Sequence, residues 1–159
     1  RCGAWAKEIA RARRKNVESA FLCGLLHDVG RAIVLKEACK LASQAGLALR
    51  PALVESWADA LHPAAGAALL EAWSLPGWAV VATREHHSCL QAQSSSEEAY
   101  TVALADRIAH DSAEGEPTDA AREALARHPA LERLGIYGDE FEALLTHRPT
   151  VEKLVEALG

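Results

Sequence analysis

Signals that begin and end helices recur along the whole chain and constrain its fold more than any other feature. Asn16 precedes an apolar run and can accept hydrogen bonds from the first free N–H groups of a helix. Pro51 suits a first helical turn, and Gly46 can end the preceding helix in a left-handed conformation. No segment shows the alternation of apolar and polar residues, bounded by hairpin turns, that is typical of a strand. The sequence therefore predicts an all-α fold.

The same signals give approximate limits for the helices. We expect helices over residues 1–14, 17–27, 31–44, 52–61, 63–75, 77–87 and 97–112, followed by three short helices within 118–159. Gly30 is expected to separate the second helix from the third. Pro63 is expected to open a new helix, because a proline inside a helix removes a hydrogen bond and crowds the preceding turn. Polar residues 91–96 predict a loop, and Gly115-Glu116-Pro117 predicts a break.

The length of the chain favours one domain. A chain of 159 residues, half of them apolar, can bury one sizeable core. We expect a single domain over residues 1–159, with a compact helical core over 1–110 and C-terminal helices over 111–159, in which Asp139 and Thr150 are the expected N-caps. Met is absent and the first residues read as the interior of a helix, so we expect a fragment of a longer protein.

Large apolar side chains are expected in the core. Aromatic residues at helix corners are more often buried than exposed as a ligand platform, and this applies to Trp5, Trp57, Trp73 and Trp78. Cys23, within the apolar run 21–26, is expected to be a small buried residue rather than a reactive thiol.

Charge and cysteine usage limit the possible partners and the compartment. The formal net charge is −5, from 17 basic and 22 acidic residues, so we expect no nucleic-acid partner. The basic run over residues 11–15 is expected at a solvated helix end. No apolar stretch is long enough to span a bilayer, so no membrane partner is expected. The four cysteines have no paired spacing, which favours the reducing cytoplasm.

Histidine and aspartate residues at four places in the sequence are candidate metal ligands. They are His27-Asp28, His62, His86-His87 and Asp106. Imidazole nitrogen and carboxylate oxygen suit Fe, Mn, Zn or Ni, and no cysteine cluster points to a thiolate zinc site or an iron–sulfur centre.

The spacing of these candidates bears on how they could meet. Neighbouring residues of a regular helix point in different directions, so His27 and Asp28 reach one ion only if the helix ends there. His86 and His87 either straddle a helix end or serve two ions, and a two-metal centre would use them best. The alternative is that each histidine caps a helix, fills a buried hydrogen bond or lies in solvent. That reading is preferred for three others, His110, His128 and His147.

The order of these motifs resembles a known family. The run from Gly24 to Arg31 reads Gly-Leu-Leu-His-Asp-Val-Gly-Arg, like the helix end that names the HD superfamily of metal-dependent phosphohydrolases. It is followed by His62-Pro63-Ala64-Ala65-Gly66, Trp73-Ser74-Leu75-Pro76, His86-His87 and Ala103-Leu104-Ala105-Asp106. This ordered set is similar to the HD-related output domain, HDOD.

The resemblance implies a compact helical bundle of the HD type and a ligand set. That set is His27, Asp28, His62, His86, His87 and Asp106. Arg31 replaces the lysine that follows the histidine–aspartate pair in the related HD-GYP domains. Two features depart from the catalytic relatives. The superfamily's upstream histidine would fall just before Arg1, and His86-His87 is followed by Ser88-Cys89-Leu90-Gln91 instead of a Glu and the Gly-Tyr-Pro signature.

Two functions follow from the resemblance. The first is a non-catalytic module of bacterial signal transduction, which relays the state of a protein partner or of an adjacent sensory or receiver domain. The alternative is a metal-dependent phosphohydrolase acting on a nucleotide or cyclic dinucleotide. In that case one or two ions would activate a water, and Arg31 would stabilise the charge on the phosphoryl oxygens.

Overall fold

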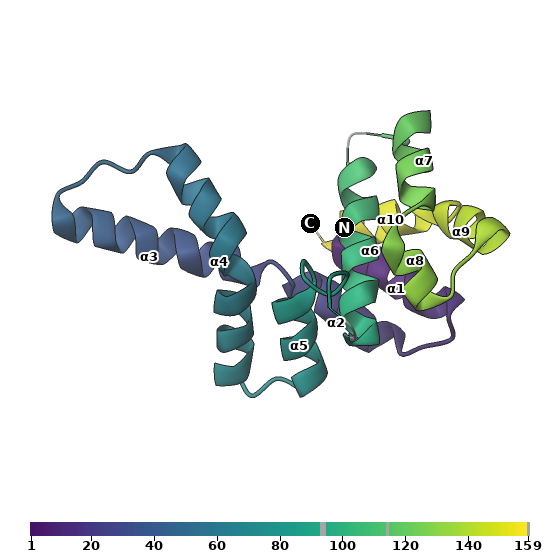
Figure 1. Cartoon of the computed structure of the whole chain (residues 1–159), viewed down its shortest axis with the longest axis horizontal. Coiled ribbons are helices and arrows are strands. Elements are labelled where there is room, and N and C mark those ends of the chain that lie inside the picture. The colour runs from purple at the N-terminus through teal and green to yellow at the C-terminus, as the bar shows by residue number, and fades with distance from the viewer. Residues whose placement is uncertain (93–94, 114, 159) are drawn as a thin grey trace.

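The fold is helical throughout the part of the chain that can be described. The computed structural model describes residues 1–92, 95–113 and 115–158, and these contain helices and no strand (Figure 1). The helices are α1 (Cys2–Ala12), α2 (Val17–Leu26), α3 (Val29–Ala45), α4 (Pro51–Ala72), α5 (Gly77–Glu85), α6 (Glu97–Asp111), α7 (Asp119–Ala126), α8 (Pro129–Leu134), α9 (Gly138–Leu145) and α10 (Arg148–Leu158). The predicted all-α fold is confirmed.

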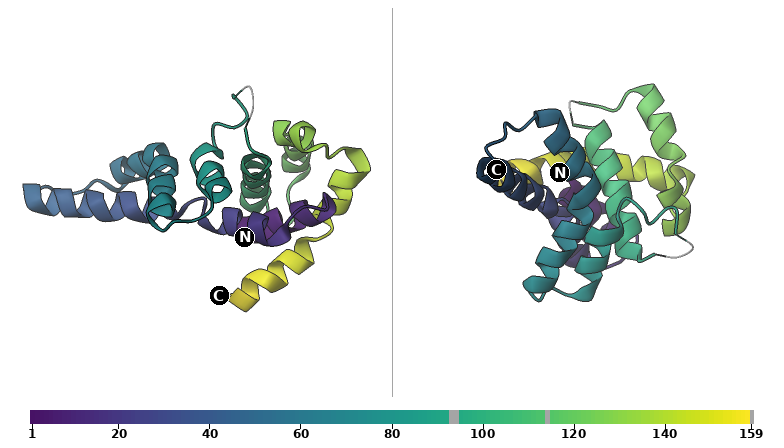
Figure 2. Two further views of the ribbon diagram at one scale, coloured as in Figure 1. Left: turned by 90° about the horizontal axis from the view of Figure 1, so that it is seen from below. Right: turned by 60° about the vertical axis from the view of Figure 1, so that its left-hand side comes forward.

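A packed body forms around α1 and α6. Helix α1 packs on α2 and α6, and α5 packs on α4 and α6. Helices α7, α8 and α9 lie on the side of the body away from α3 and α4, and α10 runs back along α1 (Figures 1 and 2). Trp5, Ile9, Leu104 and Ile108 are among the largest fully buried side chains. No helix in the described ranges is both long and apolar enough to cross a membrane.

Helices α3 and α4 form an antiparallel hairpin that projects from this body (Figure 1, left side). At its base the two helices approach closely at Gly30 of α3. A Cβ atom added to Gly30 would lie 2.0 Å from the carbonyl oxygen of His62 and 2.5 Å from the amide nitrogen of Gly66. Glycine is therefore required at this position by close backbone contact.

This contact corrects the predicted role of Gly30. The break between α2 and α3 lies at His27-Asp28, and Gly30 lies in the first turn of α3. Gly30 therefore does not end a helix, and its physical role is to let the backbones of α3 and α4 approach each other.

The prediction that Pro63 opens a new helix is wrong. Helix α4 continues through Pro63 without interruption. The proline leaves the carbonyl of Asp59 without its usual helical donor and crowds it, and Figure 1 shows α4 changing direction along its length, as expected of an internal proline. Packing of α4 on α3 and α5 on both sides of this point keeps the helix together.

Several of the predicted helix ends are confirmed. The Asn16 side chain accepts hydrogen bonds from the amides of Glu18 and Ser19, both at 3.0 Å, as predicted. Gly46 ends α3 with a φ of 65°, and Pro51 begins α4. The loop predicted over 91–96 lies between α5 and α6, although residues 93–94 fall outside the described ranges.

The C-terminal region differs from the prediction. It contains four helices, α7 to α10, instead of three. Asp139 lies in the first turn of α9, whose N-cap is Tyr137. Thr150 lies inside α10, which begins at Arg148. Asp139 lies two residues after the N-cap of α9, and Thr150 lies two residues after the first residue of α10, so both predicted caps are wrong.

The tryptophans divide between the body and the surface. Trp5 is buried and Trp78 packs partly buried against the core, as predicted, and Cys23 is fully buried. Trp57 and Trp73 are 40% and 57% exposed, so the prediction of a core position is wrong for both. Trp73 lies at the C-cap of α4, and Trp57 lies on the hairpin.

Candidate metal centre

The six predicted ligands come together where α2, α4, α5 and α6 meet. Together with Cys2, which was not among the predicted ligands, they form two neighbouring groups. Asp28, His62, His86 and His87 form the first group, and Cys2, His27 and Asp106 form the second. Within each group the candidate ligand atoms all lie within 4.8 Å of one another. The predicted convergence is therefore present, although the six residues lie far apart in the sequence, between His27 and Asp106.

Helix ends explain how adjacent residues reach the same place. His27 is the C-cap of α2 and Asp28 is the N-cap position of α3. His86 is the C-cap of α5, and His87 follows it in a turn. Both pairs straddle a helix end, which for His86-His87 is one of the two alternatives left open by the sequence, so neither pair is limited by the directions of neighbouring side chains on a regular helix.

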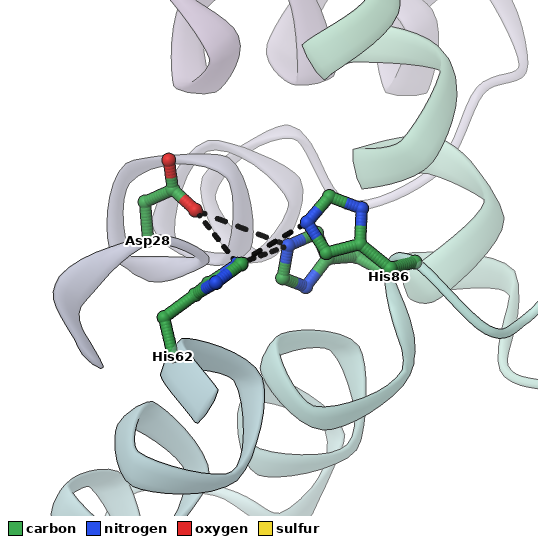
Figure 3. A group of neighbouring side chains, drawn as sticks. Asp28, His62 and His86 are labelled. Carbon is green, nitrogen blue, oxygen red and sulfur yellow. Dashed lines mark hydrogen bonds and ion pairs between the residues drawn. The ribbon is translucent and has the colours of Figure 1, made fainter. Parts of the chain in front are cut away.

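The first group is centred on the buried imidazole of His62. Its Nε2 lies 3.1 Å from Asp28 Oδ1 and 3.3 Å from His86 Nε2 (Figure 3), and 3.2 Å from His87 Nε2. His62 and His86 are almost completely buried, and His87 is exposed. Four potential ligand atoms thus face one point, with one side open to solvent.

Backbone carbonyls fix the orientation of three of the imidazoles. The Nδ1 atoms of His27, His62 and His86 lie 2.8–2.9 Å from the carbonyl oxygens of Gly24, Ala58 and Thr83, respectively. A carbonyl oxygen can only accept, so each Nδ1 donates and the Nε2 side of each ring faces the centre. This is the usual outer-shell support of metal-binding histidines.

The Nε2 atoms of His62, His86 and His87 lie close together, and a cation between them would fit their lone pairs. Burial, followed by the charges of His87 and His27, lowers the pKa of His86 to about 4. Burial, followed by His62, also lowers the pKa of His87. At neutral pH these rings therefore carry no extra proton that could join the nitrogen atoms, and a divalent ion among them fits the donor set.

In the second group the key atom is Nε2 of His27. It is buried, has no hydrogen-bond partner among the described residues, and lies 3.3 Å from Asp106 Oδ1. Burial lowers the pKa of His27, but Asp106 and Cys2 raise it by more, to about 11. Contact with His27 lowers the pKa of Asp106 in turn. Without an ion this pair therefore holds a proton, which an ion would displace.

Asp28 connects the two groups. Its Oδ1 faces His62, and its Oδ2 lies 3.7 Å from His27 Nε2. The same Oδ2 accepts a hydrogen bond from Arg31 Nε at 3.1 Å. One carboxylate therefore has an oxygen facing each group, as a bridging ligand of two ions would.

A pocket of about 450 Å³ opens over these residues. Arg31 lines it, but its guanidinium is already bound to Asp28 and, at 2.7 Å, to Asp59. His110 and His128 also line it. His110 is exposed as expected, whereas His128 is half-buried and its Nδ1 accepts the amide of Ala130 in α8.

Sequence reasoning missed Cys2. The family resemblance implies an upstream histidine just before Arg1 and points to no cysteine. The structure places the sulfur of Cys2, from the first residue of α1, in the group with His27 and Asp106. A search for any donor type at the start of the first helix would have found it.

An all-helical fold with a histidine–aspartate pair between two helices, surrounded by further histidines, defines a protein of the HD type. Within that class, the family model of the HDOD domain matches residues 1–89, so the chain belongs to the HDOD domain family. The match covers α1 to α5 and all the candidate ligands except Asp106. No curated protein and no solved structure matches the chain. The extent of the domain beyond residue 89 stays a prediction.

Proposed function

We propose that this chain is the output module of a bacterial signalling protein. It binds a protein partner or an adjacent sensory or receiver domain through the α3–α4 hairpin, and it holds divalent metal ions at the histidine–aspartate groups without hydrolysing a substrate. The observation that carries the proposal is the apolar groove of the hairpin.

The groove has the properties of a protein-binding surface. It has a volume of about 880 Å³ and is lined by apolar side chains of both helices, with Glu37 and Arg50 as its charged lining residues. Leu41 and Leu47 are 62% and 69% exposed, and Trp57 lies across from them on α4. Contiguous apolar surface on a monomer marks an interaction site, and an aromatic anchor is typical of such sites.

The groove is mechanically linked to the candidate metal centre. Asp28 stands directly before α3, and His62 lies in the middle of α4, at the base of the same hairpin. An ion held by Asp28 and His62 would tie the two helices together at this base. Metal binding and partner binding would then influence each other reciprocally, as linkage requires.

The donor set supports Fe, Mn, Zn or Ni in the first group, because it consists of imidazole and carboxylate. A protein partner also agrees with the charge of the chain. The net charge of −5 favours neither nucleic acid nor an acidic membrane surface. The module is expected in the cytoplasm.

Site-specific photo-crosslinking in the cell that naturally makes this protein tests whether a partner binds the groove of the α3–α4 hairpin. A photoreactive residue at Leu41 or Leu47 is expected to give one discrete product with another protein. The same residue at Lys153, exposed on α10, serves as the control and is expected to give none. Trp57→Glu is expected to abolish the product at Leu41. Equal products at all three positions, no product, or a crosslink only to a second copy of the chain would contradict the proposal.

A metal-dependent phosphohydrolase is the second candidate, supported by the pocket over the ligand residues. Ions held there would lower the pKa of a bound water. Arg31 and Arg107 line the pocket, but Arg31 is engaged by two carboxylates, which leaves it poorly placed to receive phosphoryl charge. Hydrolysis of a cyclic dinucleotide or nucleotide phosphate by the metal-loaded chain would favour this candidate.

A further inference from the structure

The second group differs from the first in containing sulfur. Cys2 is 7% exposed, at the start of α1, and its Sγ shares a neighbourhood with His27 and Asp106. Among the described residues, the thiol also donates a long hydrogen bond, of 3.9 Å, to the carbonyl oxygen of Val102. The thiol therefore has weak partners of its own in a polar cluster.

An independent observation points to a ligand at this place. The His27 side chain is 9% exposed, and its Nε2 lacks a hydrogen-bond partner among the described residues. Its Nδ1 is held by the carbonyl of Gly24 at 2.9 Å, which fixes the direction of Nε2. Its nearest carboxylate oxygens, Asp106 Oδ1 and Asp28 Oδ2, lie at 3.3 and 3.7 Å, so this oriented nitrogen faces other potential ligand atoms without a well-formed hydrogen bond to them.

The spacing suits a tetrahedral ion. Bond lengths of about 2.0 Å to nitrogen or oxygen and 2.3 Å to sulfur place the ligands of one tetrahedral zinc about 3.3–3.8 Å apart. His27 Nε2 lies 3.3 Å from Asp106 Oδ1 and 3.7 Å from Asp28 Oδ2. The sulfur of Cys2 lies within 4.8 Å of the His27 and Asp106 ligand atoms, so a shift of about 1 Å completes the shell.

We propose that Cys2, His27 and Asp106, with Asp28 Oδ2 as the fourth donor, form a thiolate-containing zinc site next to the nitrogen and oxygen site of Asp28, His62, His86 and His87. This inference deepens the proposed metal-holding role and rests on it. Thiolate is a soft ligand that selects Zn²⁺ over Mn²⁺ or Mg²⁺. Binding forms a sulfur–zinc bond and releases the thiol proton to solvent, with no change in oxidation state.

The other cysteines are suitable controls. Cys23 is also fully buried, but it belongs to neither ligand group. The sulfur of Cys89 is directed to the carbonyls of His86 and Ala99. Cys39 is exposed on α3. A thiolate signal that survives replacement of these three residues can only come from Cys2.

Cobalt substitution of the whole reduced chain tests the site. The metal-free protein is titrated with Co²⁺, which gives an intense near-ultraviolet charge-transfer band when a thiolate is bound. We expect a band from one thiolate per chain in the wild type and in Cys23→Ala, Cys39→Ser and Cys89→Ala. We expect its loss in Cys2→Ser, which keeps the size of the side chain. His62→Ala is expected to keep the band, because His62 belongs to the other group. Circular dichroism checks that each variant is folded.

The outcomes separate this inference from the proposed function. No band in the wild type, or a band that persists in Cys2→Ser, overturns the thiolate site. If Co²⁺ still binds in that case and His62→Ala removes it, the metal-holding role stands and only the inference fails. If no metal binds at all, both fail. Should Cys2→Ser not fold, Asp106→Asn gives the same test. This variant keeps the cysteine but removes a negatively charged ligand, so we expect the thiolate band to need more Co²⁺ to reach its full intensity.

Discussion

The two ends of the α3–α4 hairpin are built in different ways. At the base, Gly30 meets the backbone of α4, and His62 is completely buried among polar donors. Toward the tip, Leu41 and Leu47 have most of their side chains in solvent. Close backbone contact tolerates no added atom, whereas an exposed apolar surface contributes nothing to folding. The base is therefore specified by packing and by the ligand groups, whereas the apolar tip is left uncovered, which is the basis of the proposed docking role.

The largest expected effect is at the base. Gly30→Ala would place a Cβ 2.0 Å from the His62 carbonyl oxygen, which forces α3 and α4 apart. We expect a loss of more than about 3 kcal/mol in the free energy of unfolding, because the strain falls on backbone atoms. Urea denaturation followed by circular dichroism measures it.

Gly77→Ala is the matched control for that substitution. Gly77 begins α5, and a Cβ there would meet nothing within 4 Å. We expect a change of at most about 1 kcal/mol, toward higher stability, because alanine restricts the unfolded chain. If the two variants lost equal stability, the close contact at the base would not be the cause.

The second prediction compares leucines of the body and the tip. Leu70 of α4 is fully buried, and Leu70→Ala is expected to cost about 2–5 kcal/mol through lost apolar contact and a cavity. Leu41→Ala is expected to change stability by no more than about 0.5 kcal/mol. A large loss for Leu41→Ala in thermal or urea denaturation would mean that the groove is part of the core and not a docking surface.

The third prediction concerns acid at the base of the hairpin. Burial, and then His87 and His27, lowers the pKa of His86 to about 4, below the 6.5 of an unfolded histidine. Between these values the unfolded chain binds more protons, so the stability of the metal-free protein falls as the pH drops through the window and levels off below it. The full shift corresponds to about 3 kcal/mol.

The other histidines do not reverse this acid effect. The pKa of His87 is also lowered, which adds in the same direction. His27, whose pKa is raised to about 11, contributes fully below pH 6.5 and leaves the window unchanged. Urea midpoints measured in chelator from pH 7 to 4 should show the loss in the wild type and a smaller one in His86→Gln. Equal slopes would exclude His86 as its source.

A small effect on stability is expected at the tip. Trp57→Glu is expected to lower the free energy of unfolding by about 1–2 kcal/mol, since Trp57 is 40% exposed and its partly buried ring loses some apolar contact. The same substitution is expected to remove partner binding, because aromatic anchors carry a large share of interface energy. An unfolded variant, or one that still binds its partner, would contradict the separation of base and tip.

The sequence was sufficient for the parts of the structure that depend on local chemistry or on an ordered motif. Asn16 and Gly46 mark helix ends through their own side-chain or backbone properties, and the histidine–aspartate order predicted the convergence of six residues. The prediction for Pro63 is wrong because the packing of α4 on α3 and α5 overrules the local tendency of proline to begin a helix. Trp57 and Trp73 are exposed because no other helix in the described ranges covers them fully, and a local sequence pattern does not show which helices will cover a residue.

Cys2 illustrates a different limit of the sequence. Its thiol becomes a candidate ligand only through the position of α1 against α2 and α6. The same residue type at Cys23 is an inert part of the core. Residue type alone therefore did not distinguish them, and three-dimensional placement did.

Turnover by the metal-loaded chain tests most directly whether the base of the hairpin holds ions without catalysis. The chain, loaded with Mn²⁺, Fe²⁺ or Zn²⁺ and with its ion content measured, is incubated with a cyclic dinucleotide and with a nucleotide phosphate. A His27→Ala/Asp28→Ala variant, which is expected to bind no ion, is treated in the same way. We predict bound ions in the wild type and equal, negligible hydrolysis by both proteins. Robust hydrolysis by the wild type that is lost in the double variant would contradict the account and make this protein a phosphohydrolase.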